Sequence, residues 1–138
     1  MATYHVGRLL DHVHLRAKDL AATGRFYNAV LKALEQPPGT STPHSFFADE
    51  LYISAVDANE KIPPTHVHLA FQARDEAMVK AFYDAAVKAG GTDNGAPGPR
   101  DYHPGYYGAY VLDPDGNNIE AVFHGPNKRS APSVTIEG

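Results

Sequence analysis

Two short segments of the chain alternate strictly between polar and apolar residues. The segment His12-Val-His-Leu15 has a polar residue at every second position, and His66-Val-His-Leu69 repeats the same four letters. Side chains point alternately to the two faces of a β-strand, so this period of two predicts half-buried strands. One face of each strand is then apolar and packs on a core, whereas the other face carries two histidines.

A helical pattern follows each of these strands. Residues 18–33 align without a gap on residues 74–89, and apolar side chains recur three and four positions apart in both. Asp19 and Asp75 precede the apolar positions and suit the N-cap of a helix. The pair Gly90-Gly91 predicts the end of the second helix, because glycine readily adopts the left-handed conformation that terminates helices.

Short apolar segments complete each half of the chain. Four further strands are predicted, at residues 45–48, 51–56, 106–112 and 117–124. The last two are joined by Asp113-Pro-Asp-Gly116, whose residues favour a turn. Residues 35–44 and 92–105 carry glycine and proline and are expected to be loops.

The chain therefore contains an internal repeat. A third block matches in the same order, because Ile53-Ser-Ala-Val56 aligns with Ile119-Glu-Ala-Val122. These blocks predict two homologous βαβββ modules, at residues 8–57 and 64–124, joined by a linker that contains Pro63-Pro64. The predicted fold class is α+β, with the two modules forming a cup from curved mixed sheets.

The composition excludes several classes of protein. The 138 residues carry a net charge of −4 with scattered basic residues, so neither a nucleic acid nor a membrane surface is an expected partner. Cysteine is absent, which excludes disulfides and thiolate metal sites. No signal peptide or membrane span is evident, so we expect one cytoplasmic domain that acts on a small molecule, with the polar tail 125–138 at its periphery.

The polar faces of three predicted strands gather imidazole and carboxylate groups. His12 and His14 share a face of the first strand, His66 and His68 share the equivalent face in the second module, and Glu120 lies on the last strand. A sheet that curves around this face makes a cup lined by ligands that suit Fe, Mn, Zn, Ni or Co. A single histidine on a strand is more often a hydrogen-bonded surface residue, but the repetition of the pair favours a metal site.

The symmetry of the repeat indicates a ligand set. A two-fold arrangement of the modules brings His12 beside His66, and Ser54 beside Glu120. A serine hydroxyl is a poor metal ligand, so we predict three protein ligands, His12, His66 and Glu120, with a position left open as in catalytic sites. The alternative in which the second histidine of each pair is the ligand stays open.

Several motifs carry a resemblance to a known family. They are Asp11-His12-Val, Lys18-Asp-Leu20 followed by Phe26-Tyr27, Thr65-His66-Val, and Asp113-Pro-Asp-Gly-Asn-Asn-Ile-Glu120. Over about residues 8–124 the chain resembles the vicinal oxygen chelate superfamily, which includes glyoxalase I, extradiol ring-cleaving dioxygenases, fosfomycin-resistance thiol transferases and bleomycin-resistance proteins. The resemblance implies a glyoxalase-like fold and the same three ligands for a divalent metal. It also implies a homodimer, because in many relatives two chains share each site.

The resemblance further implies a glyoxalase-like enzyme of the lyase or isomerase type. Its small substrate chelates the metal through two adjacent oxygens. Glyoxalase I usually has a fourth ligand, a glutamate, where this chain has Ser54. Extradiol dioxygenases and the thiol transferases have three ligands and are the alternatives, together with a metal-free drug-binding resistance protein.

Catalysis also requires groups that move protons and bind the substrate. The predicted catalytic residues are the histidines on the ligand face and at its strand end: His14, His68 and His124. The long segment 92–105 and the strand after it carry the predicted substrate-binding residues, because long loops in compact domains are often functional. These residues are Arg100, Tyr102, His103 and Tyr107.

Overall fold

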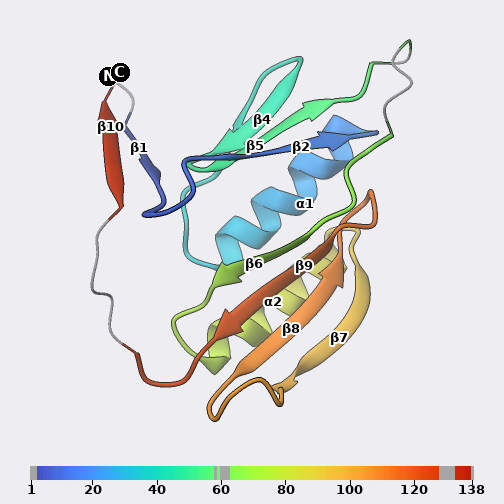
Figure 1. Cartoon of the computed structure of the whole chain (residues 1–138). Coiled ribbons are helices and arrows are strands. Elements are labelled where there is room, and N and C mark those ends of the chain that lie inside the picture. Colours follow the sequence, from blue (N-terminus) through green and yellow to red (C-terminus); the bar gives the residue numbers. More distant parts are fainter. Residues whose placement is uncertain (1–2, 58, 60–62, 128–132, 138) are drawn as a thin grey trace.

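The structure, a computed structural model, describes residues 3–57, 59, 63–127 and 133–137. Its elements are β1 (Thr3–Val6), β2 (Val13–Ala17), α1 (Leu20–Ala33), β3 (Thr40–Ser41), β4 (Ser45–Ala48), β5 (Leu51–Ala55), β6 (His68–Gln72), α2 (Glu76–Lys88), β7 (Thr92–Pro99), β8 (Tyr107–Leu112), β9 (Asn118–Phe123) and β10 (Val134–Glu137). Between β1 and β10 the order of one strand, one helix and three strands occurs twice (Figure 1). This order confirms the predicted α+β fold of two βαβββ modules.

The two modules have the same sheet topology. The first sheet has the order β2-β5-β4-β3 and the second has the order β6-β9-β8-β7. In each sheet the first strand of the module runs parallel to its last strand, and the other neighbours are antiparallel. The helix of each module covers one face of its own sheet and leaves the other face open (Figure 1).

Both helices begin where the sequence predicts, and α2 ends just before the predicted Gly90-Gly91 pair. The Asp19 carboxylate accepts a hydrogen bond from the Ala22 backbone N–H at 3.1 Å, and the Asp75 carboxylate accepts one from Met78 at 2.8 Å. These bonds satisfy backbone donors that have no partner within the helix. After α2, Gly90 adopts a φ of +103°, which L side chains rarely tolerate. Within the described residues, no helix is long and apolar enough to cross a membrane.

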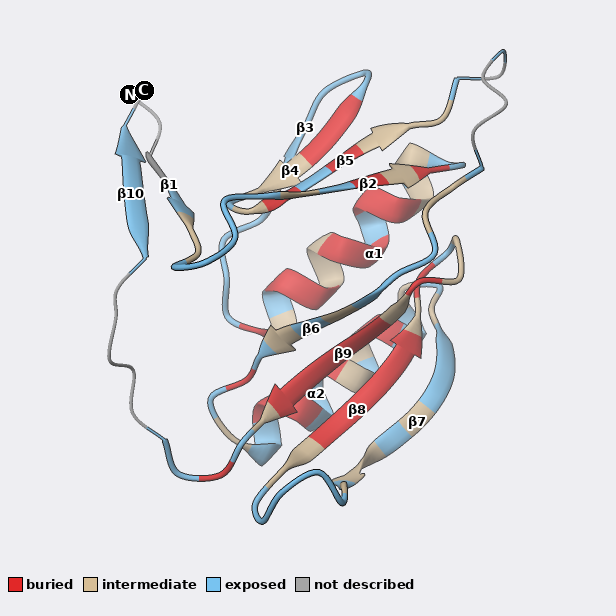
Figure 2. Cartoon of the chain, in the orientation of Figure 1, coloured by how far each residue is buried: buried red, intermediate tan, exposed pale blue. Residues whose placement is uncertain are grey.

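One apolar core joins the two modules. The helices α1 and α2 pack against each other. Buried side chains from both modules belong to one cluster, among them Phe26, Val30, Ile53, Val79, Phe82 and Ile119. Figure 2 shows these buried segments on the helices and on the central strands of both sheets. Burial of each large apolar side chain contributes about 1.5–3 kcal/mol, so the joint between the modules is part of the folding core.

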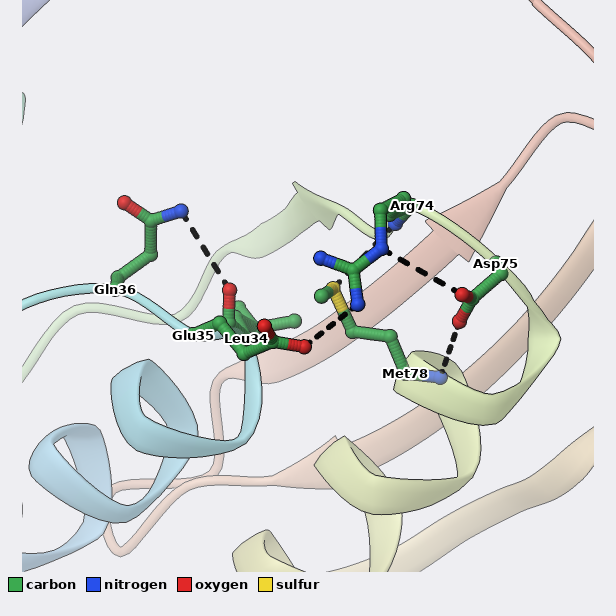
Figure 3. Close-up of polar contacts among 6 residues, drawn as sticks. All are labelled: Leu34, Glu35, Gln36, Arg74, Asp75 and Met78. Carbon is green, nitrogen blue, oxygen red and sulfur yellow. Dashed lines mark hydrogen bonds and ion pairs between the residues drawn. The ribbon is translucent and has the colours of Figure 1, made fainter.

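Polar contacts also hold the modules together. The Tyr27 hydroxyl of α1 donates a hydrogen bond to Asp113 Oδ2 at 2.6 Å, and both residues are buried. At the far end of α1, Arg74 Nη2 lies 2.6 Å from Glu35 Oε2 (Figure 3). This second contact is exposed, so it adds little stability.

The predicted loop at residues 92–105 is wrong over its first part. Strand β7 occupies the eight residues Thr92–Pro99. It lies at the edge of its sheet, where glycine and proline are tolerated, and its pairing with β8 shifts register on both sides of Gly95. The two-residue strand β3 likewise lies inside the segment 35–44 that was expected to be a loop.

Strands β1 and β10 form a separate two-stranded sheet that the sequence analysis does not predict. They pair antiparallel from Thr3–Glu137 to Val6–Val134, and the described ends of the chain lie side by side (Figure 1). The His5 backbone N–H donates to Asp49 Oδ1 at 3.0 Å and ties this sheet to the first module. The tail therefore contributes an exposed strand at the periphery of the molecule (Figure 2).

Candidate functional site

The open faces of the two sheets carry the histidines. In β2, Leu15 and Ala17 face the helix and are buried, whereas His14 points to the other face and is exposed. In β6, His68 and Ala70 are exposed, whereas Leu69 and Phe71 are partly buried. The alternation in the sequence therefore assigns the faces of both strands correctly.

Glu120 is a buried carboxylate on the open face of the second sheet. It lies on β9 between its cross-strand neighbours Ala70 and Tyr110, and it is only 1% exposed. One carboxylate oxygen, Oε1, lies 2.8 Å from His68 Nε2, and the other accepts a hydrogen bond from the Tyr106 hydroxyl. These two contacts offset the cost of removing a carboxylate from water.

Tyr106 is a site residue that the sequence analysis misses. Burial and the hydrogen bond to Glu120 raise the pKa of the Tyr106 hydroxyl, so it remains a neutral donor. Gly108 makes room for this contact, because a Cβ there would lie 3.0 Å from Glu120 Oε2. The register of the hairpin is the signal that finds Tyr106: counting outward from the turn pairs Tyr110 with Glu120 and places Tyr106 on the same face.

The first module contains an equivalent but uncharged pair. His14 Nε2 lies 2.7 Å from Ser54 Oγ, as His68 lies beside Glu120 in the second module. In each module the second histidine of the His-x-His pair thus contacts the last strand. Ser54 occupies the position where the resemblance allows a fourth ligand, and its hydroxyl is already bonded to an imidazole.

The first histidine of each pair lies outside this contact. His12 precedes β2, and its Nδ1 lies 2.7 Å from Asp11 Oδ1. His66 precedes β6, and its Nε2 lies 3.0 Å from where a Cβ on Gly116 would be, beside the turn that leads to β9. In the part of the chain that the structure describes, no three His, Asp or Glu side chains gather to hold a metal.

The donors at the second sheet suit part of a divalent metal site. Carboxylate and imidazole groups are common ligands of Fe, Mn, Zn, Ni and Co. Glu120 supplies a carboxylate and His68 an imidazole, and the two groups contact each other. His12 directly precedes the first sheet, and in the described part of the chain no strand of that sheet pairs with a strand of the second sheet. Within one chain Glu120, a predicted ligand, therefore contacts His68, a predicted catalytic residue, whereas the predicted ligand His12 contacts Asp11.

The segment between β7 and β8 brings several predicted site residues together. His103 Nε2 lies 2.9 Å from His124 Nδ1, and the two rings stack with their centres 5.1 Å apart. The ring of Tyr106 packs edge-on against both histidines and against Tyr102. A cluster of aromatic and imidazole rings thus stands next to the residue that contacts Glu120.

The other two predicted substrate-binding residues lie on opposite faces of the sheet. The guanidinium carbon of Arg100 is 5.2 Å from the centre of the Tyr110 ring, on the open face. Tyr107 packs against the apolar core, and the Lys80 ammonium of α2 lies 5.9 Å from its ring centre. Arg100 is therefore placed near Glu120, whereas Tyr107 is directed toward the helix layer.

A hollow of about 800 Å³ opens at the end of the second sheet. It is lined by residues 99–107 and by Glu76 in the first turn of α2. Glu120 is not among the lining residues, so this hollow borders the site through Tyr106 and extends around the sheet end toward α2.

Fold and site together define a class of protein. It has two βαβββ modules of the same topology, with a histidine on the open face of each sheet and a buried carboxylate on the second. The chain belongs to the Glyoxalase/Bleomycin resistance protein/Dioxygenase superfamily, whose sequence model matches residues 9–121. The recognition made from the motifs is thereby confirmed. A comparison with curated proteins gives no match.

Solved structures agree with this membership. The chain is 32% identical to a glyoxalase/bleomycin resistance protein from Albidiferax ferrireducens T118, over 83% of this chain and 98% of that chain, with a TM-score of 0.71. It is 23% identical to lactoylglutathione lyase from Agrobacterium tumefaciens, over 84% and 93% of the two chains, with a TM-score of 0.59. It is 21% identical to oxidase ChaP-H1, over 84% and 95%, with a TM-score of 0.57. The last two likenesses show the fold alone.

Proposed function

We propose that the protein is a divalent-metal-dependent, glyoxalase-like enzyme of the lyase or isomerase type. Its substrate is a small molecule that chelates the metal through adjacent oxygens, and its place of action is the cytoplasm. The observation that carries this proposal is Glu120, a carboxylate that is 1% exposed and held by His68 and Tyr106 on a sheet face. An apolar residue usually serves stability as well as a buried charge does, so this burial favours a functional role.

We infer that two chains complete each metal site. In this proposal His66 and Glu120 come from one chain and His12 comes from its partner in a homodimer. Within one chain the modules pack through α1 and α2, and a backbone bond joins Thr65 to Arg16 of β2. Among the described residues, no strand of the first sheet pairs with a strand of the second. Exposed apolar residues flank the two histidines, with Leu9 78% and Val67 37% exposed. Exposed apolar surface beside predicted ligands supports a protein contact at this place.

The residues around Glu120 divide into holding and proton-moving groups. A bound metal supplies Lewis-acid polarisation of the substrate oxygens. The Tyr106 hydroxyl fixes the orientation of the Glu120 carboxylate through its hydrogen bond. His68 and His14 stand on the open faces as the proposed proton-moving groups, and their contacts with Glu120 and Ser54 orient the two rings. His124 is a further proton-moving group through its contact with His103.

Ser54 favours a second candidate, an extradiol-type dioxygenase. Its hydroxyl contacts His14 at 2.7 Å and supplies no carboxylate where glyoxalase I usually has a fourth ligand. One protein of similar fold is named lactoylglutathione lyase and another is named an oxidase, so the fold is compatible with both reactions. Oxygen uptake on catechols after anaerobic reconstitution with Fe(II), measured beside isomerisation of a hemithioacetal, separates the two. A thiol transferase remains an alternative and would show neither activity.

Titration of five variants with Mn(II) or Zn(II) tests the ligand assignment. Glu120→Gln, His12→Ala and His66→Ala should lose most of the metal affinity, because each removes a direct ligand. His14→Ala and His68→Ala should keep the metal and lose about 10–100-fold in affinity or activity, as is typical of groups that support a ligand. Bound metal is measured by equilibrium dialysis, and circular dichroism verifies that each variant is folded.

Two outcomes correct the proposal. If His14→Ala and His68→Ala abolish binding while His12→Ala and His66→Ala retain it, the ligands are the second histidines, as the His68–Glu120 contact also allows. If the unaltered protein binds no metal, the metal-dependent enzyme is excluded and a metal-free drug-binding protein takes its place.

A further inference from the structure

The side chain of Arg100 folds back over β7 onto the open face of the second sheet. A Cβ at Gly95 would lie 3.3 Å from Arg100 Nη2, and a Cβ at Gly98 would lie 3.2 Å from Nη1. The guanidinium also lies over the ring of Tyr110, 5.2 Å from its centre. The two glycines therefore leave the space that the guanidinium occupies, and a side chain at either position would displace it.

This position is close to Glu120. Tyr110 is the direct cross-strand neighbour of Glu120, so both side chains share one face. Neighbouring strands lie about 4.8 Å apart, which places the guanidinium roughly one to two strand spacings from the carboxylate. The Tyr110 ring also lies 6.0 Å from the His68 ring, so one tyrosine contacts both the charged site and Arg100.

The charge of Arg100 has no acidic partner among the described residues. Its hydrogen-bond partners are neutral: Nη1 donates to the Pro99 carbonyl at 3.1 Å, and Nη2 donates to the Ala96 carbonyl at 2.8 Å. A guanidinium has five N–H donors, so these bonds fix its plane and leave donors for a ligand. The stacking on Tyr110 adds a cation–π attraction that holds the same plane.

We propose that Arg100 is an anion subsite that binds a carboxylate of the substrate. This inference rests on the proposed function and adds the substrate class to it: a small organic acid whose carboxylate is separate from the oxygens that reach the Glu120 centre. A planar guanidinium matches a carboxylate through two parallel N–H bonds, a geometry that a lysine ammonium does not offer. Arg100 is then a specificity-determining residue, since a neutral substrate of the same shape gains nothing from it.

Benzoate is the probe for this subsite, and benzamide is its uncharged control. The full chain, with and without Zn(II), is titrated while the arginine Nε–Hε signals are followed by ¹⁵N nuclear magnetic resonance, with Arg100 assigned from its variants. Benzoate should shift the Arg100 signal saturably and benzamide should not. Calorimetric titration with benzoate compares the variants: Arg100→Met should weaken benzoate binding about 10–100-fold, the loss expected for a charge-assisted hydrogen bond, and Arg100→Lys should fall between it and the unaltered protein.

Arg74→Met is the matched control, because Arg74 is an exposed arginine paired with Glu35 at the joint of the two helices. It should bind benzoate as the unaltered protein does. Equal benzoate binding by Arg100→Met and Arg74→Met overturns the proposal, as does a failure of the unaltered protein to bind benzoate. The test is separable from the metal site: Glu120→Gln should lose the metal and keep the benzoate-induced shift at Arg100.

Discussion

The Glu120 carboxylate lies on a sheet face, and protein groups contact both of its oxygens. His68 approaches one oxygen and the Tyr106 hydroxyl donates to the other. Because the raised pKa of Tyr106 keeps the phenol protonated, this donor is present throughout the neutral range. The contact is available only because Gly108 has no side chain in the space between them. Orientation of the carboxylate therefore depends on a tyrosine that lies fourteen positions away in the chain.

Tyr106→Phe tests this dependence with the ring contacts retained. The variant removes the hydroxyl and leaves the edge-on packing against His103 and His124 in place. We expect metal affinity to fall about 10–100-fold, the range for loss of a group that orients a ligand. Tyr83→Phe is the control, because it removes the hydroxyl of a tyrosine on α2, whose pKa is raised by Asp93 and not by Glu120. Equal Mn(II) affinities for the two variants would show that Tyr106 does not support the ligand.

At the scale of elements, the turn between β8 and β9 links the two modules. Asp113 Oδ1 accepts from the backbone N–H of Asp115 and of Asn117, both at 2.9 Å, and so closes the turn. Asp113 Oδ2 accepts from Asn117 Nδ2 and from the hydroxyl of Tyr27 in α1. The turn that fixes the register of Glu120 is thus bonded to the helix of the other module. Burial and the nearby Asp113 charge raise the pKa of Tyr27 well above its ordinary 10.0.

Tyr27→Phe should lower the free energy of unfolding by about 1.5–3 kcal/mol near pH 7, because a buried carboxylate loses a donor. The effect of pH has a definite sign. Below pH 10 the tyrosine is protonated in both states, whereas above it the unfolded chain ionises and the folded Tyr27 does not. The stability of the unaltered protein should therefore fall as the pH rises above 10, and the fall should be smaller in Tyr27→Phe. Urea unfolding at several pH values measures both, and an unchanged slope would contradict the assignment.

Some of the elements could be predicted from the sequence and others could not. Helix N-caps at Asp19 and Asp75 and the open faces of β2 and β6 follow from local pattern, because capping and alternation involve only neighbours in the chain. Strand β7 does not, since an edge strand with register shifts has no alternation to detect. Tyr106 reaches Glu120 through the register of the hairpin. Arg100 reaches Tyr110 because its side chain folds back over glycine. Neither feature is a local property of the sequence.

At the scale of the whole molecule, the packing of the two modules bears on where the metal ligands meet. Within one chain the modules contact each other through α1 and α2, through the Tyr27–Asp113 and Arg74–Glu35 contacts, and through a backbone bond between Thr65 and Arg16 of β2. The open faces are left for other contacts (Figure 1). We therefore expect a homodimer, with the first sheet of each chain facing the second sheet of its partner. Light scattering should show twice the mass of the 14.9 kDa chain.

Mixing two inactive variants distinguishes a shared site from a site within one chain. His12→Ala and Glu120→Gln should each bind little metal alone. When the two are unfolded together and refolded in equal amounts, half of the dimers are hybrids, and each hybrid has one site with all three ligands intact. Metal should then occupy about a quarter of all the sites in the mixture, because the other site of each hybrid carries both changes. The control is a mixture of His66→Ala and Glu120→Gln, which alter the same half of the site and should recover nothing. Recovery in neither mixture would place all three ligands within one chain, and dialysis against Mn(II) measures each case.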